Sequence, residues 1–288
     1  MTTAEILKKV RRIEIKTRGL SNHIFAGEYH STFKGRGMSF SEVREYIPGD
    51  DVKFIDWNVT ARFSHPFVKV FEEERELIVM LIVDISRSSL FGTQQRLKRE
   101  LITELAAVLS FSATTNNDKV GVIFFSDKVE KYIPPKKGKG HILRIIRELI
   151  TLEPIHTKYT NVGVALEFLN NVIKKRTITF LLSDFVSQHY EHPLQLAARK
   201  HDLVGIHVYD KHDKELPEAG LIQVMDAETG KMAWLDTGDK SVRKQYAAFF
   251  EESNKYCSQS FRKSGASLLN IRTDEDYVKA LQIYFKSK

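Results

Sequence analysis

The sequence predicts an α/β fold built on a doubly wound, mostly parallel sheet of about six strands. The run LIVMLIV at residues 77–83 contains seven consecutive apolar residues, which is typical of a parallel strand that is covered on both faces. Further apolar strand patterns alternate with helical periodicity toward the C-terminus, and this alternation implies right-handed crossovers between parallel strands. A chain of 288 residues with 42% apolar content has room for one such domain and its extensions.

We expect residues 1–75 to be an N-terminal extension that begins with a short basic helix. Ile6, Val10 and Ile13 recur at helical spacing, which predicts an amphipathic helix over residues 4–16. The first 36 residues carry eight lysines and arginines against three glutamates. We expect this helix to pack on its own domain with its basic face in solvent. The alternative is peripheral docking of that face to a partner or a membrane surface.

The extension also contains the motif RxYxPGDDxxxIDW, which is spelled by Arg44, Tyr46, Pro48, Gly49, Asp50, Asp51, Ile55, Asp56 and Trp57. The Pro-Gly pair predicts a tight turn, after which the aspartates bond to nearby backbone amides or cap the following segment. The alternative is a second metal or acid/base cluster formed by Asp50, Asp51 and Asp56. Turn chemistry is favoured because Arg44 and Lys53 are available to pair with these acids.

Residues 76–288 contain the elements of the predicted sheet and the helices that cover it. Strands are predicted at residues 77–83, 119–124, 177–182, 203–209 and 267–271, with 129–133 as an antiparallel edge strand. Helical spacing of apolar residues predicts helices at 96–115, 142–150, 161–174, 194–201, 242–262 and 274–285. Alternation over residues 221–235 predicts a hairpin inserted at about 215–240.

Oxygen-bearing side chains stand at strand ends and at one helix start of this domain. Asp84, Ser86 and Ser88 come directly after the first strand, Thr160 precedes a later helix, and Asp184 follows the next strand. Ligands of open α/β sheets collect at the carboxyl ends of the strands, and hard oxygen donors suit Mg²⁺ or Mn²⁺ better than zinc. The sequence therefore predicts a metal site. The alternative is a turn whose side chains cap the next helix.

The series DxSxS, a later Thr and then an Asp resembles, in this order and topology, the metal-ion-dependent adhesion site of von Willebrand factor A domains. The resemblance implies that Ser86, Ser88 and Thr160 are direct metal ligands, while Asp84 and Asp184 hold the ion mainly through water. Lys158 and Tyr159 precede Thr160, where such domains often carry small, Gly-rich residues. This departure puts the approach of the threonine loop to the metal in question.

The RxYxPGDDxxxIDW motif followed by VKVFEEERELIVMLIVDISRSS is similar to the bacterial family known as domain of unknown function 58. The similarity covers nearly the whole chain and extends to the segments DAETGKMAWLDT and TDEDYVKAL. Members of that family are typically encoded beside MoxR-type AAA+ ATPases. The resemblance therefore implies an ATPase partner and a chaperone-like role in complex assembly, and it implies no established enzymatic activity.

The donor set also suggests how the site would work. A site of mostly neutral hydroxyls leaves much of the charge of a bound Mg²⁺ uncompensated. A carboxylate from another protein can then bind at the open coordination position. We therefore predict a metal-dependent protein-interaction module, not an enzyme, that serves as an adaptor for a MoxR-type AAA+ ATPase.

Two other functions compete with this prediction. A Mg²⁺-dependent phosphatase would use Asp84, but enzymes of that type need a second Asp two residues on as general acid, where this chain has Ser86. Nucleic-acid binding would use the basic N-terminal segment with Lys136, Lys137 and Lys139, but the sequence lacks a reader motif or an aromatic stacking ladder. The 37 acidic residues are also interspersed with the 44 basic ones. No specific nucleic acid is therefore expected.

Composition and apolar runs indicate the compartment. The single Cys257 excludes an intrachain disulfide and places no demand on an oxidising compartment. Charged residues interrupt the N-terminus every few positions, so it cannot form the apolar core of a signal peptide, and the longest apolar run is the seven-residue strand. We expect a cytoplasmic protein that does not span a membrane.

Overall fold

The computed structural model describes residues 5, 8, 10–14, 38–73, 77–93, 96–152, 159–226 and 230–287. The chain forms two compact units, one made of residues 1–32 and 78–288 and the other of residues 33–77. Within the described residues, no helix combines the length and the apolar character needed to cross a membrane.

The larger unit contains the predicted sheet. Its strands are β3 (Ile78–Asp84), β4 (Lys119–Phe125), β5 (Val129–Lys136), β6 (Ile178–Ser183), β7 (Asp202–Tyr209) and β10 (Ser267–Arg272). The spatial order is β10-β7-β6-β3-β4-β5. All neighbouring pairs are parallel except β4 and the edge strand β5, which are antiparallel. The predicted doubly wound, mostly parallel α/β fold is confirmed, and the strand order reverses between β3 and β6.

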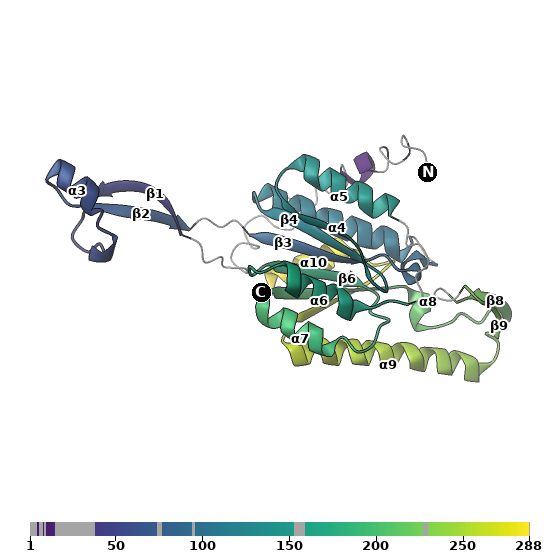
Figure 1. The fold of residues 1–288 in the computed structure, drawn as a ribbon. Helices are drawn as coiled ribbons and strands as arrows, with labels where there is room; N and C mark the ends of the chain where they lie inside the picture. The colour runs from purple at the N-terminus through teal and green to yellow at the C-terminus, as the bar shows by residue number, and fades with distance from the viewer. Residues whose placement is uncertain are drawn as a thin grey trace. The chain divides into compact units, whose positions relative to one another are not determined.

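Helices cover both faces of this sheet (Figure 1). They are α4 (Lys98–Thr115), α5 (Lys139–Thr151), α6 (Val162–Val172), α7 (Glu191–Lys200), α9 (Lys240–Ser264) and α10 (Tyr277–Lys286). α4 and α5 lie on one side, and α6, α7 and α9 lie on the other. Leu181 of β6 packs in the core cluster under α6, α7 and α9. The ring of Phe180, the residue before it in the strand, contacts the ring of Phe285 in α10. Successive strand residues point to opposite faces, so α10 lies on the α4 side.

The central strand β3 is buried on both sides. Residues 79–83 have no exposed surface. Met80 and Ile82 belong to the cluster beneath α6, α7 and α9, and their neighbours in the strand face the α4 side. Coverage of both faces explains why the strand is continuously apolar instead of alternating. The first polar side chain after this run therefore emerges at the carboxyl edge of the sheet.

Two shorter elements and the inserted hairpin lie between these strands and helices. The 3-10 helix η2 (Arg87–Leu90) follows β3, and the short helix α8 (Lys211–Lys214) follows β7. The hairpin of β8 (Leu221–Met225) and β9 (Met232–Asp236) comes next, with Gln223 opposite Trp234. It occupies the predicted position, and the side chain of Trp234 is exposed.

The smaller unit is an antiparallel pair with two helical segments. Its elements are β1 (Met38–Glu45), η1 (Val52–Phe54), α3 (Trp57–Phe63) and β2 (Phe67–Glu73). The two strands were not predicted. β1 is a mixed polar and apolar segment, MSFSEVRE, and its pairing with β2 contains a register shift between Phe40 and Glu42. A two-stranded sheet of this kind lacks the long apolar run that identified β3.

The aspartates of the smaller unit have the turn and capping roles that the sequence favoured. Arg44 donates two hydrogen bonds of 2.8 Å to the carboxylate of Asp50. Asp51 accepts from the backbone N–H of Lys53 at 3.1 Å. Asp56 caps α3 by accepting from the N–H groups of Asn58 and Val59. Each acid has its own partners, which supports turn chemistry over a second metal cluster.

Part of the predicted basic helix can also be placed. Residues 10–14 are helical and Val10 is buried. Glu14 lies 2.5 Å from the ammonium group of Lys139 at the start of α5. These contacts support packing of the helix on its own domain. Glu5 and Lys8 are also helical, whereas the remaining positions of the predicted helix, including Ile6, lie outside the described residues.

Packing between β7 and α9 yields a first prediction. A Cβ atom at Gly205 would overlap the ring of Phe261, which is buried in the core, and would also meet a methyl group of Leu268. Gly205→Ala should therefore lower the free energy of unfolding by about 1–3 kcal/mol, measured by urea denaturation. Gly140→Ala in the first turn of α5 is the matched control, because nothing lies within 4 Å of its added Cβ. An equal effect of both substitutions would show that the β7–α9 contact can relax.

Burial of His201 at the end of α7 yields a second prediction. Its side chain is 2% exposed, and its Nδ1 lies 2.9 Å from the hydroxyl of Thr177. Burial, helped by Lys200, lowers the pKa of His201 to about 4. Because the pKa is depressed on folding, the neutral ring contributes stability above its ordinary pKa of about 6.5, and that contribution is lost as the pH falls through about 4.

His201→Asn should remove this titration while keeping a polar partner for Thr177. Urea denaturation between pH 7 and 4 should show a loss of unfolding free energy that is smaller in the variant, by about 3 kcal/mol. Parallel pH profiles for the two proteins would contradict the assignment.

Candidate metal-binding site

The candidate site lies where β3 and β6 end side by side. Val83 pairs with Leu182 in the parallel register of these strands, which brings Asp84 next to Ser183. Helices that follow or precede the two strands cover opposite faces of the sheet. The chain therefore diverges above this point and leaves a crevice at the carboxyl edge, where α/β sheets bind their ligands.

Asp84 is fixed by two hydrogen bonds from the chain itself. Its Oδ1 accepts from the backbone N–H of Ser86 at 2.8 Å, and its Oδ2 accepts from the hydroxyl of Ser183 at 2.5 Å. The same Ser183 hydroxyl accepts from the N–H of Phe185 at 3.0 Å. Asp84 is only 2% exposed. Its carboxylate thus orders both the β3 loop and the β6 loop, and the sequence analysis did not identify Ser183 as part of this arrangement.

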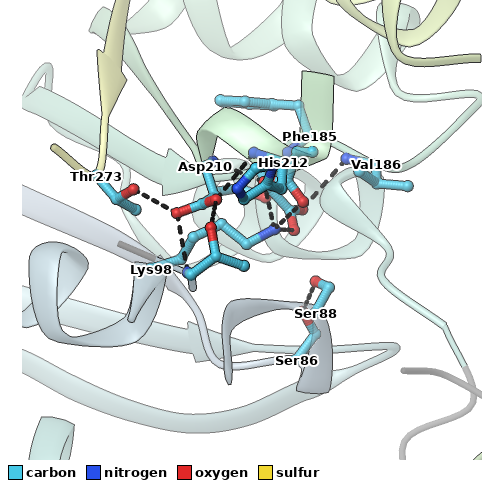
Figure 2. A network of polar contacts seen from close by, with 12 residues as sticks. Ser86, Ser88, Lys98, Phe185, Val186, Asp210, His212 and Thr273 are labelled. Carbon is cyan, nitrogen blue, oxygen red and sulfur yellow. Dashed lines mark hydrogen bonds and ion pairs between the residues drawn. The ribbon is translucent and has the colours of Figure 1, made fainter. Parts of the chain in front are cut away.

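The two serine hydroxyls lie next to each other. Ser86 Oγ and Ser88 Oγ are 2.9 Å apart, and Figure 2 shows them together, with Ser88 directed toward the network that contains Lys98. Ser86 is the residue before η2, yet its side chain makes no capping hydrogen bond to that helix. The alternative in which these side chains only cap the next helix therefore does not describe Ser86.

Asp184 continues the arrangement from β6. Its Oδ1 accepts from the N–H of Val186 at 3.3 Å, and its Oδ2 lies 3.0 Å from the Lys98 ammonium group. Burial alone would raise the pKa of Asp184, but Lys98 and then the Ser88 hydroxyl hold it below its ordinary value. Phe185, the next residue, has a left-handed backbone with φ of 53°. A bulky residue adopts this conformation only when its surroundings require it, so the turn after β6 is tightly specified.

Lys98 is the main site residue that sequence reasoning missed. It belongs to the first turn of α4, its side chain is 4% exposed, and it also lies 3.1 Å from the carboxylate of Asp213 in α8. Burial would lower the pKa of Lys98, but Asp184 and Asp213 raise it above its ordinary value, so the group is a cation. A lysine at the start of an amphipathic helix is ordinarily solvated, and the local sequence carries no signal for its burial.

Asp210 holds the surrounding loops together. It is fully buried and accepts hydrogen bonds from the hydroxyls of Thr93 and Thr273 at 2.5 and 2.6 Å. It also caps α8 by accepting from the N–H of His212. Figure 2 shows Asp210 between Thr273 and the segment that carries Lys98. This carboxylate ties the loop after η2 to the ends of β7 and β10, and it too was absent from the predicted site.

Thr160, the fifth predicted ligand, lies beside this network. It is buried just before α6, whose first turn is capped by Asn161. Thr160 and Val186 line a groove of about 960 Å³ between α6 and α9. Among the described residues, no hydrogen bond joins the Thr160 hydroxyl to the other four predicted ligands. The structure therefore brings Asp84, Ser86, Ser88 and Asp184 into one network and places Thr160 beside it.

The charge and donor chemistry of this network fit a hard divalent cation. Burial, and next the repulsion of Asp184, raise the pKa of Asp84 to about 7 against the opposing hydrogen bonds from Ser183 and Ser86. The two carboxylates thus destabilise each other's charge, and a nearby cation would relieve this repulsion. The remaining donors are hydroxyl oxygens, which suit Mg²⁺ or Mn²⁺.

Comparison with known proteins places the chain among bacterial relatives. It is 29% identical over 281 residues to an uncharacterized protein of Mycobacterium tuberculosis (strain H37Rv). The aligned region covers 97% of this chain and 88% of that protein. It is also 26% identical over 159 residues to an uncharacterized protein of Mycobacterium avium. That aligned region covers 54% of this chain and 93% of that protein.

A solved structure supports the fold. The crystal structure of an aerotolerance-related membrane protein from Bacteroides fragilis is similar with a TM-score of 0.51 and 15% identity, over 74% of this chain and 100% of that chain.

The family model described as "Protein of unknown function DUF58" matches residues 42–256, which include the RxYxPGDDxxxIDW motif and all five predicted ligands. The family predicted from the sequence is thereby confirmed: the chain belongs to the family described as protein of unknown function DUF58.

Proposed function

We propose that this protein is a metal-dependent protein-interaction module that holds Mg²⁺ or Mn²⁺ at Asp84, Ser86, Ser88 and Asp184, with Thr160 as a further ligand. The observation that carries the proposal is the pair of adjacent serine hydroxyls beside two buried carboxylates at the topological switch point. When bound, the cation supplies an electrophilic coordination position for a carboxylate of another protein.

The chain's own residues have distinct parts in this function. Asp84 positions the backbone of Ser86 and thereby the two hydroxyls, while its own oxygens are both engaged by hydrogen bonds. Such a carboxylate is suited to holding the site in place and is poorly presented as a nucleophile. This supports a binding role over the alternative of a phosphatase that uses Asp84.

The groove beside Thr160 supports a polypeptide as the ligand. Its volume of about 960 Å³ exceeds what a single side chain needs, and it is lined by exposed apolar side chains such as Tyr159 and Phe249. A partner that presents a carboxylate to the metal could lay the flanking residues along this groove. Metal coordination would then give affinity and the groove would add selectivity.

We further propose a MoxR-type AAA+ ATPase as the partner, with this chain as an adaptor in chaperone-like complex assembly in the cytoplasm. Membership of the DUF58 family supports this proposal, because members of the family that the sequence resembles are typically encoded beside such ATPases.

The metal site can be tested by titration. Ser86→Ala removes one proposed ligand and should weaken Mn²⁺ binding by at least about tenfold in isothermal titration calorimetry. Ser110→Ala is a matched control, because it removes another buried hydroxyl, one that donates to the backbone carbonyl of Ala106 within α4. Equal Mn²⁺ affinity in the wild type and the Ser86 variant would rule out Ser86 as a ligand.

The partner can be tested by capture from native lysate. The wild-type protein should retain a MoxR-type AAA+ ATPase when Mg²⁺ is present, and retention should be lost with EDTA or with Ser86→Ala. The Ser110→Ala control should retain the ATPase like the wild type. Capture that is indifferent to EDTA would show that the metal site does not mediate the interaction.

A further inference from the structure

We propose that Lys98 is a resident cation of this site that competes with the divalent metal for Asp184. On metal binding, the Lys98 ammonium group would leave Asp184 and remain paired with Asp213. This inference rests on the metal site of the proposed function. It goes further by assigning a role to a residue outside the predicted ligands and by predicting how that residue sets the affinity of the site.

The contacts of Lys98 distinguish it from a surface lysine. Its ammonium group lies 3.0 Å from Asp184 Oδ2 and 3.1 Å from Asp213 Oδ2, and the side chains of Lys98 and Asp184 are almost fully buried. A buried ammonium group needs a carboxylate partner, because burying it unpaired is strongly unfavourable. Two partners on different elements mean that Lys98 can give up one of them and stay paired.

The charge balance explains the competition. Asp184 is at once the principal partner of Lys98 and a predicted ligand of the metal. An ammonium group within ion-pair distance of a ligand oxygen repels any cation that approaches the same oxygen. The dielectric constant is low in such a buried position, so this repulsion is weakly screened. Lys98 should therefore weaken divalent metal binding relative to an uncharged side chain of similar size.

The structure also provides a place for the displaced ammonium group. A cavity of about 110 Å³ adjoins Lys98 and is lined by Asp184, Asp213 and Asn254 among others. This volume is enough for a few water molecules. The buried Oδ1 of Asn254 has no hydrogen-bond partner among the described residues. A buried acceptor of this kind normally has a donor, and the Lys98 ammonium group could supply one after moving toward Asp213.

This arrangement connects the metal site to α8. Asp213 belongs to α8, and the preceding residue, His212, accepts a hydrogen bond from the hydroxyl of Tyr246 in α9 at 3.0 Å. The hairpin β8–β9 follows α8 directly in the chain (Figure 1). Lys98 is therefore the side chain through which a change at Asp184 would reach α8.

The test compares Mn²⁺ affinity in wild type, Lys98→Met and Asp213→Asn by isothermal titration calorimetry on the full chain. Lys98→Met removes the competing charge and should bind Mn²⁺ about tenfold more tightly or better. Asp213→Asn removes the alternative partner, commits Lys98 to Asp184 and should bind Mn²⁺ more weakly than wild type. Lys131→Met is the matched control, because Lys131 is paired with Glu148 away from the site, and it should leave the affinity unchanged.

Thermal unfolding gives an independent reading. Lys98→Met should melt at a lower temperature than wild type in EDTA, because its carboxylates lose their partner, and Mn²⁺ should raise its melting temperature more than that of wild type. If Lys98→Met does not fold, Asp213→Asn alone decides: weaker binding supports the proposal, and equal or tighter binding overturns it.

The outcomes separate this inference from the function on which it rests. Ser86-dependent Mn²⁺ binding that Lys98→Met leaves unchanged or weakens would overturn the role of Lys98 and leave the metal site standing. Absence of Ser86-dependent binding in both wild type and Lys98→Met would overturn the metal site itself, and with it the inference.

Discussion

The hydrogen bond from Ser183 to Asp84 joins the ends of β3 and β6, and the arrangement of the candidate site depends on it. The two residues are 99 positions apart in sequence, yet the parallel register places them side by side. Because Asp84 is buried, each of its oxygens must be satisfied within the protein. The N–H of Ser86 satisfies one and the hydroxyl of Ser183 the other. The same carboxylate thus fixes the serine loop after β3 and the turn that carries Asp184.

The burial of these carboxylates also sets their pKa values. Burial, and next the repulsion of Asp184, raise the pKa of Asp84, while Lys98 holds the pKa of Asp184 down. The buried ammonium group of Lys98 pairs with two carboxylates, those of Asp184 and Asp213. Burial also raises the pKa of Asp213, even though Lys98 opposes this shift. The network therefore has more carboxylate than ammonium charge, and this surplus favours a bound cation.

The sequence predicted those parts of the fold and site that have a local physical cause. Continuous apolar character at residues 77–83 identified β3, because only coverage on both faces produces it. The spacing of Asp84, Ser86 and Ser88 is likewise local, and their approach to Asp184 follows once the strands are known to be parallel.

The remaining parts arise from contacts between segments that are distant in sequence. Lys98 meets Asp184 and Asp213 across 86 and 115 positions. The local sequence therefore describes it as an ordinary lysine at a helix start. Asp210 is similar, since its partners Thr93 and Thr273 lie 117 and 63 positions away. The strands of the smaller unit were missed for another reason, namely that a two-stranded sheet needs no long apolar run.

Stability alone does not explain why these charges are buried. Replacing a buried ion pair by well-packed apolar side chains is often neutral or stabilising, so several buried ionised groups beside one another are not what the stability of the fold requires. The rest of this sheet follows that rule, since residues 79–83 of β3 and most of β4 are apolar and buried. The charged groups gather instead at the carboxyl edge, where the strand order reverses and a ligand can approach. Ligand binding, as proposed for this site, would account for their placement, and the ammonium group of Lys98 offsets part of the carboxylate charge.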